Sequence, residues 1–273
     1  MTQVKPGEEI VEQVRKRYRS IAVASSSCCG PVPSCCGTTP VSRHLGYGEN
    51  ELSAVPAEAD LGLGCGAPVG HLALKPGETV LDLGSGPGLD ALLAAKQVGP
   101  TGRVIGVDMT PEMLERARAT AARAGLTHVE FRQGRLEALP VADASVDAVT
   151  SNCVINLVPD KAAVFREVAR VLRPGGRAVI ADIVLERPLP EAVAKDMLAW
   201  AGCVAGAALR RDYFRMVDEA GLRDVSVLKE EDYAASLAQI ASGEAQTLLQ
   251  RWGLTQESVQ GVVMSVTWRA VKG

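Results

Sequence analysis

Aromatic residues and histidine are scarce in this chain, and it has neither a basic cluster nor a long apolar run. Aromatic residues make up only 4% of 273 residues, so the core must be built from alanine, valine and leucine. The net charge of −3, without a basic cluster, argues against nucleic-acid binding through phosphates. No apolar run reaches the ~18–20 residues of a membrane helix, and the polar N-terminus carries no secretory signal. We therefore expect a cytoplasmic protein that binds neither nucleic acid nor membrane.

Cysteine, by contrast, occurs seven times. In a reducing compartment these residues favour metal binding or redox chemistry over a static disulfide framework. Two vicinal pairs, Cys28-Cys29 and Cys35-Cys36, lie in a segment rich in Ser, Gly and Pro that predicts no regular element, and Arg43–Asn50 is expected to continue irregular. The other three stand singly: Cys65, Cys153 and Cys203. The spacing differs from that of paired C-x-x-C zinc ligands, although the four upstream thiols could hold zinc.

Short apolar runs alternate with segments of helical period along most of the remaining chain. Strands are predicted at Thr79–Leu83, Val104–Asp108, Val129–Gln133, Ser145–Ser151 and Arg177–Leu185. Helices are predicted at Glu8–Ala24, Leu89–Val98, Pro111–Ala124 and Lys161–Leu172. This alternation predicts an α/β fold with a doubly wound, mostly parallel, Rossmann-like sheet. A small C-terminal α+β region follows: a helix reaching Trp200, a helix at Asp212–Gly221, and strands at Val225–Leu228 and Gly261–Val271.

The stretch Val80–Asp90 carries the clearest binding signal. Its turn, Gly84-Ser-Gly-Pro-Gly88, lets a ligand contact bare backbone and leads into a helix N-terminus. Asp108 ends the next strand, where a carboxylate can accept both hydroxyls of a ribose. Asp82 would repel a pyrophosphate but attract the ammonium of an amino acid. The pattern therefore favours S-adenosylmethionine, which carries a ribose and an ammonium but no phosphate, over a dinucleotide.

The acceptor of the methyl group is indicated by what the expected site contains. No Asn/Asp-Pro-Pro-aromatic run, typical of amino-directed methyltransferases, follows the fourth strand. Neither His44, His71 nor His128 lies at the carboxyl end of a predicted strand, where a base for oxygen methylation is expected. Thiolates bind soft ions, and trivalent arsenic held by three thiolates keeps a lone pair that can attack a sulfonium methyl group directly. The cysteines therefore favour arsenic as the acceptor.

Two other functions stay open on these residues. One is methylation of a carbon or oxygen of a small metabolite, such as a quinone precursor, with the cysteines incidental. The other is a metalloid- or zinc-binding module on a methyltransferase fold that has lost its activity.

Five stretches make the chain resemble the arsenite S-adenosylmethionine methyltransferase family, of bacterial type, within the class I methyltransferases. They are Asp60-Leu-Gly-Leu-Gly-Cys-Gly66, Val80-Leu-Asp-Leu-Gly-Ser-Gly86, Val104-Ile-Gly-Val-Asp-Met-Thr-Pro-Glu-Met113, Ser151-Asn-Cys-Val-Ile-Asn-Leu157 and Gly202-Cys-Val-Ala-Gly206. The resemblance implies methylation of arsenite, or of its thiol conjugates, to mono- and dimethylarsenic species in arsenic detoxification. It also implies a thiol reductant as co-substrate, either thioredoxin or glutathione.

The same resemblance implies roles for individual residues. Arsenic(III) is expected at Cys65, Cys153 and Cys203, with Cys65 alternating between arsenic ligand and disulfide partner of Cys36 or Cys35. Residues expected around S-adenosylmethionine are Tyr18, Asp82, Gly84, Ser85, Gly86, Asp108, Met109, Gly134, Leu136 and Asn152. We divide the chain into a cysteine-rich substrate and redox segment (1–66), a cofactor-binding domain (67–190) and a region completing the arsenic site (191–273).

Overall fold

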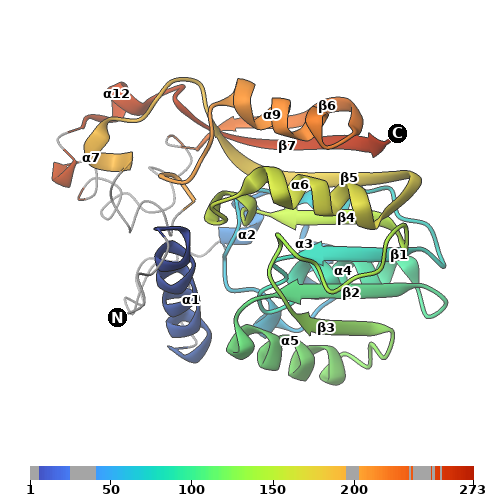
Figure 1. Cartoon of the computed structure of the whole chain (residues 1–273). Helices are drawn as coiled ribbons and strands as arrows, with labels where there is room; N and C mark the ends of the chain where they lie inside the picture. Colours follow the sequence, from blue (N-terminus) through green and yellow to red (C-terminus); the bar gives the residue numbers. More distant parts are fainter. Residues whose placement is uncertain are drawn as a thin grey trace, which may run out of the picture.

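The computed structural model describes residues 6–24, 41–194, 203–233, 235, 247, 250–252 and 254–273. These residues contain a sheet of seven strands in the order β3-β2-β1-β4-β5-β7-β6 (Figure 1). The strands are β1 (Thr79–Leu83), β2 (Arg103–Asp108), β3 (Val129–Gln133), β4 (Val146–Asn152), β5 (Leu172–Leu185), β6 (Leu222–Asp232) and β7 (Val263–Lys272). β1 to β5 run parallel, and β7 is antiparallel to both β5 and β6. The predicted mostly parallel α/β fold is confirmed.

Helices cover both faces of this sheet. The α-helices are α1 (Pro6–Ala24), α2 (Val41–His44), α3 (Glu49–Ser53), α4 (Leu89–Val98), α5 (Pro111–Arg123), α6 (Lys161–Val171), α7 (Glu191–Ala194), α9 (Arg210–Glu219) and α12 (Gln256–Val259). The described residues also form three short 3₁₀ helices: η1 (Ala57–Ala59), η2 (Pro68–His71) and η3 (Ile155–Leu157). In the described part of the chain, no helix is long and apolar enough to cross a membrane.

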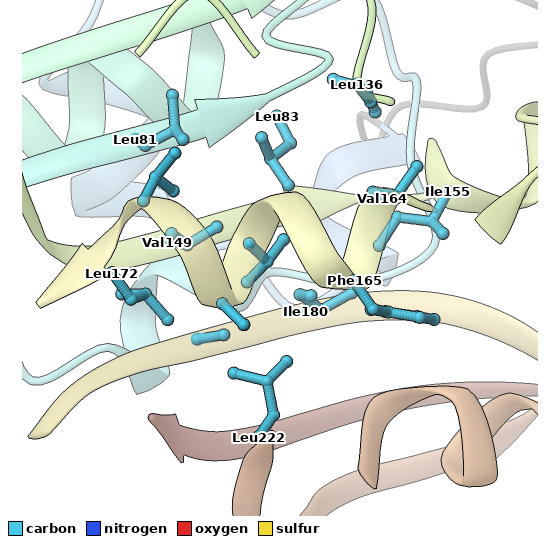
Figure 2. Close-up of a cluster of buried hydrophobic side chains, with 14 of the residues drawn as sticks. Leu81, Leu83, Leu136, Val149, Ile155, Val164, Phe165, Leu172, Ile180 and Leu222 are labelled. Atoms are coloured by element: carbon cyan, nitrogen blue, oxygen red, sulfur yellow. The ribbon is translucent and has the colours of Figure 1, made fainter. Parts of the chain in front are cut away.

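Alternation along the strands divides the core into two layers. Side chains of successive strand residues point to opposite faces, so Val80 packs with α4 and α5 whereas Leu81 packs with α6. Figure 2 shows the layer between the sheet and α6, in which Phe165 is fully buried. The segment before β1 belongs to the other layer, because Leu45 and Tyr47 are buried among the side chains of α4.

Four predicted elements differ from the structure. β5 begins at Leu172, because its expected Pro-Gly-Gly turn lies inside a strand with a register shift opposite Val146 and Ala148. The single strand expected at Val225–Leu228 is longer, spanning all of β6. Arg43–Asn50, expected to be irregular, includes the end of α2 and the start of α3. Of the helix expected to reach Trp200, α7 is seen, and 195–200 lie outside the described residues.

The parallel strands bring the predicted site to one edge of the sheet. The glycine turn follows β1, Asp108 ends β2, and Asn152 ends β4. Because β1 pairs in parallel with both β2 and β4, these three ends lie side by side. Helix α1 stands beside the same edge (Figure 1).

Candidate functional site

The turn between β1 and α4 adopts a backbone conformation that suits glycine. Gly84, Gly86 and Gly88 have φ values of +65°, +50° and +100°. A Cβ on Gly84 would lie 2.4 Å from Cγ1 of Val154, whereas a Cβ on Gly86 would meet only backbone, at 4.0 Å. The N–H groups of Gly84 and Ser85 donate to the Val107 carbonyl at 2.7 and 3.0 Å. The turn is therefore anchored to β2 while its backbone at Gly86 stays uncrowded.

Carboxylates surround this turn. Oδ2 of Asp108 accepts from the N–H of Gly86 at 2.9 Å, and its Oδ1 accepts from the N–H of Thr110 at 2.8 Å. Asp82 is only 2% exposed, and its pKa lies well above the usual range because of burial and then the nearby charges of Asp90 and Asp108. Within the described residues, Oδ2 of Asp82 and Oγ of Ser85 are buried without a hydrogen-bond partner. These atoms fit a ligand that brings hydrogen-bond donors and positive charge.

Three cysteines that are far apart in the sequence meet at the same edge. Cys65, Cys153 and Cys203 are free thiols, 3%, 7% and 3% exposed, in one buried cluster. Sγ of Cys203 donates to the Cys153 carbonyl at 2.8 Å. Cys153 and Cys203 have φ values of +58° and +66°. Such left-handed backbone is uncommon outside glycine and concentrates at functional sites.

Two of these thiols have raised pKa values, for different reasons. The hydrogen bonds to Cys203 and Cys65, followed by burial, raise the pKa of the Cys153 thiol well above its ordinary value. Burial is the main cause that raises the pKa of Cys65. As the sulfurs stand, no set of three His, Cys, Asp or Glu side chains in the described ranges is arranged to hold a metal ion.

Asn152 connects the cysteine cluster to its surroundings. Its Oδ1 accepts from the N–H of Cys65 at 3.0 Å, and its Nδ2 donates to the carbonyl of Gly66 at 2.7 Å. A Cβ on Gly64 would lie 2.8 Å from this Oδ1, and a Cβ on Gly66 would lie 2.8 Å from Cβ of Ala181. The glycines on either side of Cys65 therefore allow its loop to pack closely against Asn152 and the sheet.

The sequence analysis missed two residues that complete this arrangement, Tyr47 and Asp90. The Tyr47 hydroxyl donates to Oδ1 of Asp90 at 2.7 Å and accepts from Nδ2 of Asn152 at 2.9 Å. Asp90 lies in the first turn of α4, directly after the glycine turn, and that position was a readable signal. Tyr47 had no such signal, because it lies in a segment without a motif.

The other predicted site residues lie in four different places. Tyr18 and Met109 are partly buried against the cysteine cluster. Gly134 is held near the end of β2, where its N–H donates to the Asp108 carbonyl at 3.0 Å. Leu136 is buried in the core layer beside α6 (Figure 2). Cys35 and Cys36 lie outside the described residues.

Comparisons with known proteins agree with this geometry. A family model described as a methyltransferase domain matches residues 74–221. An arsenite methyltransferase of Halobacterium salinarum is 48% identical over 235 residues, which cover 82% of this chain and 60% of that protein. One of Aquipseudomonas alcaligenes is 39% identical over 187 residues, which cover 65% of this chain and 53% of that protein. The chain thus spans between half and three fifths of these two curated relatives.

A solved structure is similar over more of its length. The crystal structure of an arsenic(III) S-adenosylmethionine methyltransferase from Chlamydomonas reinhardtii matches with a TM-score of 0.61 and 34% identity. The match covers 86% of this chain and 74% of that one.

Proposed function

The chain belongs to the arsenite S-adenosylmethionine methyltransferase family, and from this premise we propose that it transfers a methyl group from S-adenosylmethionine to trivalent arsenic. One observation carries the proposal. The three buried free thiols of Cys65, Cys153 and Cys203 meet beside the glycine turn, at the carboxyl edge of the sheet. Such a site offers soft ligands for arsenic and positions them next to a methyl donor.

The residues around the turn suit the proposed methyl donor. Asp108 would accept the ribose hydroxyls. The buried oxygens of Asp82 and Ser85 that lack a hydrogen-bond partner among the described residues suit the amino-acid end, which carries positive charge. The uncrowded backbone at Gly86 leaves room for direct contact. Bound S-adenosylmethionine supplies an electrophilic methyl group on a sulfonium sulfur.

The three thiols would bind arsenic without a separate base. Arsenite carries three hydroxyl groups, and three thiols displace them as three water molecules while three As–S bonds form. Each thiol proton leaves in a water molecule, so the raised pKa values of Cys65 and Cys153 do not oppose binding. Sγ of Cys203 must turn away from the Cys153 carbonyl to become the third ligand. A thiol conjugate of arsenite would exchange ligands in the same way, releasing the free thiol.

Methyl transfer then needs a reductant. The arsenic lone pair forms the new As–C bond while the electrons of the broken C–S bond stay on sulfur, which leaves arsenic formally pentavalent. A thiolate from outside the arsenic site then attacks the arsenic-bound sulfur of Cys65: the S–S bond forms, the As–S bond breaks, and its electron pair stays on arsenic, which returns to the trivalent state, ready for a second methylation. We assign this disulfide to Cys65 and either Cys36 or Cys35, with thioredoxin or glutathione restoring the thiols. This thiol chemistry suits the reducing cytoplasm.

The test supplies the purified protein with arsenite, methyl-labelled S-adenosylmethionine and glutathione, and separates the arsenic products. We expect label in mono- and dimethylarsenic species. Cys153→Ser and Cys203→Ser are expected to abolish labelling while still binding S-adenosylhomocysteine with unchanged affinity. Retained turnover in either variant would refute the thiol site.

The redox assignment has its own test. Cys65→Ser, and Ser in place of the upstream partner, are expected to lose the first methylation but keep part of the activity with monomethylarsenite. Cys28→Ser is the matched control and is expected to keep both steps. An equal loss of both steps in Cys65→Ser would contradict the disulfide role.

A further inference from the structure

The amide of Asn152 lies between the two halves of the site. Its two N–H bonds face three acceptors: the Gly66 carbonyl at 2.7 Å, the Tyr47 hydroxyl at 2.9 Å and Oδ2 of Asp90 at 3.3 Å. Its Oδ1 holds the N–H of Cys65. Because two hydrogens serve three acceptors, a shift of Asp90 changes how firmly Asn152 holds the Cys65 loop.

Tyr47 and Asp90 are built into this arrangement rather than exposed to solvent. They are 4% and 7% exposed, so removing Tyr47 would take the hydroxyl donor from buried Oδ1 of Asp90, and removing Asp90 would take the acceptor from the buried Tyr47 hydroxyl. Asp90 receives the Tyr47 hydroxyl on one oxygen and the Asn152 amide on the other. The hydrogen bond from Tyr47 therefore fixes the orientation of the Asp90 carboxylate toward Asn152.

Asp90 also interacts electrostatically with the cofactor turn. It lies two residues after Gly88, and its charge is a leading cause, after burial, of the raised pKa of Asp82. A positively charged group bound at Asp82 relieves the repulsion between these two carboxylates. A cofactor bound at the turn therefore changes the electrostatic environment of Asp90.

We propose that Tyr47 and Asp90 are positioning residues that couple the cofactor turn, through Asn152, to the loop carrying Cys65. The importance of Cys65 for arsenic rests on the proposed function; the coupling itself does not. A bound cofactor fixes Asp90, Asp90 and Tyr47 fix the Asn152 amide, and that amide fixes the Cys65 backbone. The third thiol would thus be held in place when the methyl donor is present.

The experiment measures the alkylation rate of each cysteine by iodoacetamide, peptide by peptide, with and without saturating S-adenosylhomocysteine. In the unmodified protein we expect the ligand to slow alkylation of Cys65 at least about fivefold, within the usual range of coupling between sites. In Tyr47→Phe, which loses only the hydroxyl, the effect at Cys65 is expected to fall below about twofold. In both proteins we expect the ligand to slow alkylation of Cys153 as well. Slowed alkylation of Cys153 in Tyr47→Phe would show that this variant still binds the ligand and has lost only the coupling to Cys65.

Tyr213→Phe is the matched control. This tyrosine is fully buried and its hydroxyl also donates to a carboxylate, Asp182 at 3.1 Å, but no hydrogen bond joins it to Asn152. It should keep the full ligand effect at Cys65. Asp90→Asn is a second route to the same loss if Tyr47→Phe does not fold.

Two results would overturn the coupling: full protection of Cys65 in Tyr47→Phe, or equal loss of protection in Tyr213→Phe. Neither result depends on arsenic. If the unmodified protein shows the coupling but methylates no arsenite, the positioning inference stands and the proposed function fails.

Discussion

At the scale of single residues, Gly84 is constrained in two separate ways. Its φ of +65° disfavours any side chain, and an added Cβ would lie 2.4 and 2.5 Å from the two Cγ atoms of Val154. Gly125 has nearly the same φ, +66°, but nothing within 4 Å of an added Cβ. Alanine substitutions at these two glycines therefore separate the effect of backbone strain from that of a steric clash with Val154.

We predict that Gly84→Ala lowers S-adenosylhomocysteine affinity at least tenfold and destabilises the fold by about 2–4 kcal/mol, because strain and overpacking add. Gly125→Ala should cost only about 1–2 kcal/mol and leave affinity unchanged. Calorimetry measures the binding and urea unfolding the stability. Adding Val154→Ala to Gly84→Ala should restore part of the stability. If the two alanine variants behaved alike, collision with Val154 would not be the cause.

Single residues also show why the site was only partly predictable. Asp82, Gly84 and Asp108 belong to short motifs whose spacing reflects local geometry, so the sequence analysis could assign them. Tyr47 meets Asp90 across 43 positions and Asn152 across 105. Contacts of that separation depend on the folded core, and nothing beside Tyr47 in the sequence indicates them.

At the scale of elements, Arg177 of β5 connects this strand to the segment before β1. Its guanidinium donates to both carboxylate oxygens of Glu78, at 2.8 and 2.7 Å, and to the Leu72 carbonyl at 2.6 Å. These hydrogen bonds are the main cause that lowers the pKa of Glu78. The two side chains are only 14% and 16% exposed, whereas the pair Arg103–Glu130 is 55% and 45% exposed.

We predict that Arg177→Lys lowers the free energy of unfolding by about 1–3 kcal/mol, because an ammonium cannot replace a bidentate guanidinium. Arg103→Lys, the control at an exposed pair, should change it by less than about 0.5 kcal/mol. Since the pKa of Glu78 is lowered, its contribution is present above its unfolded pKa and is lost as the pH falls. Urea unfolding at pH 7 and pH 3.5 measures both effects. A loss in Arg177→Lys no larger than in the control would contradict the prediction.

A buried carboxylate near Cys65 joins three elements. Oδ1 of Asp182 in β5 accepts from the Asn156 amide of η3 at 2.7 Å, and its Oδ2 accepts from the Tyr213 hydroxyl of α9 at 3.1 Å. Burial is the main cause that raises its pKa to about 7, although the nearby Lys161 of α6 acts in the opposite direction. The folded protein thus binds a proton here that the unfolded chain releases near pH 4.

It follows that the free energy of unfolding falls as the pH rises from about 4 to about 7, because Asp182 ionises in the unfolded chain while it stays protonated in the folded protein. We predict that Asp182→Asn, which mimics the protonated carboxyl, gains stability relative to the unmodified protein across this window. Unfolding by urea at pH 4.5, 6 and 7.5 measures the difference. Asp224→Asn at an exposed position should show no such trend. A constant difference between Asp182→Asn and the unmodified protein at all three pH values would refute the argument.

Some element boundaries agree with those predicted from the sequence pattern, and others do not. β1 and α4 agree with the prediction to the residue, because a glycine marks each change of period. β5 does not, since Pro174 and its glycines are typical of a turn but lie in a strand whose register shift accommodates them. Pairing partners that are distant in the sequence decide such cases.

At the scale of the whole molecule, the proposed cofactor and arsenic sites belong to one folded unit. The cofactor turn lies in the segment matched by the methyltransferase family model, and Cys65, just outside it, is buried together with Cys153 and Cys203. A ligand that binds only the folded state raises the free energy of unfolding by about 2.7 kcal/mol at a hundred times its dissociation constant. In a chain of this size each kcal/mol shifts the midpoint of thermal unfolding by about 2–4 °C.

We therefore predict that S-adenosylhomocysteine and arsenite, each at a hundred times its dissociation constant, raise the unfolding midpoint by roughly 5–10 °C in scanning calorimetry. In Cys153→Ser the arsenite shift should fall to below about 1 °C while the S-adenosylhomocysteine shift stays unchanged. Glutathione is present throughout, so that disulfide formation does not contribute. With both ligands the shift should exceed the sum of the separate shifts, because coupling through Asn152 makes each ligand bind more tightly when the other is present. Strictly additive shifts would mean that the two ligands bind independently, without coupling between their sites.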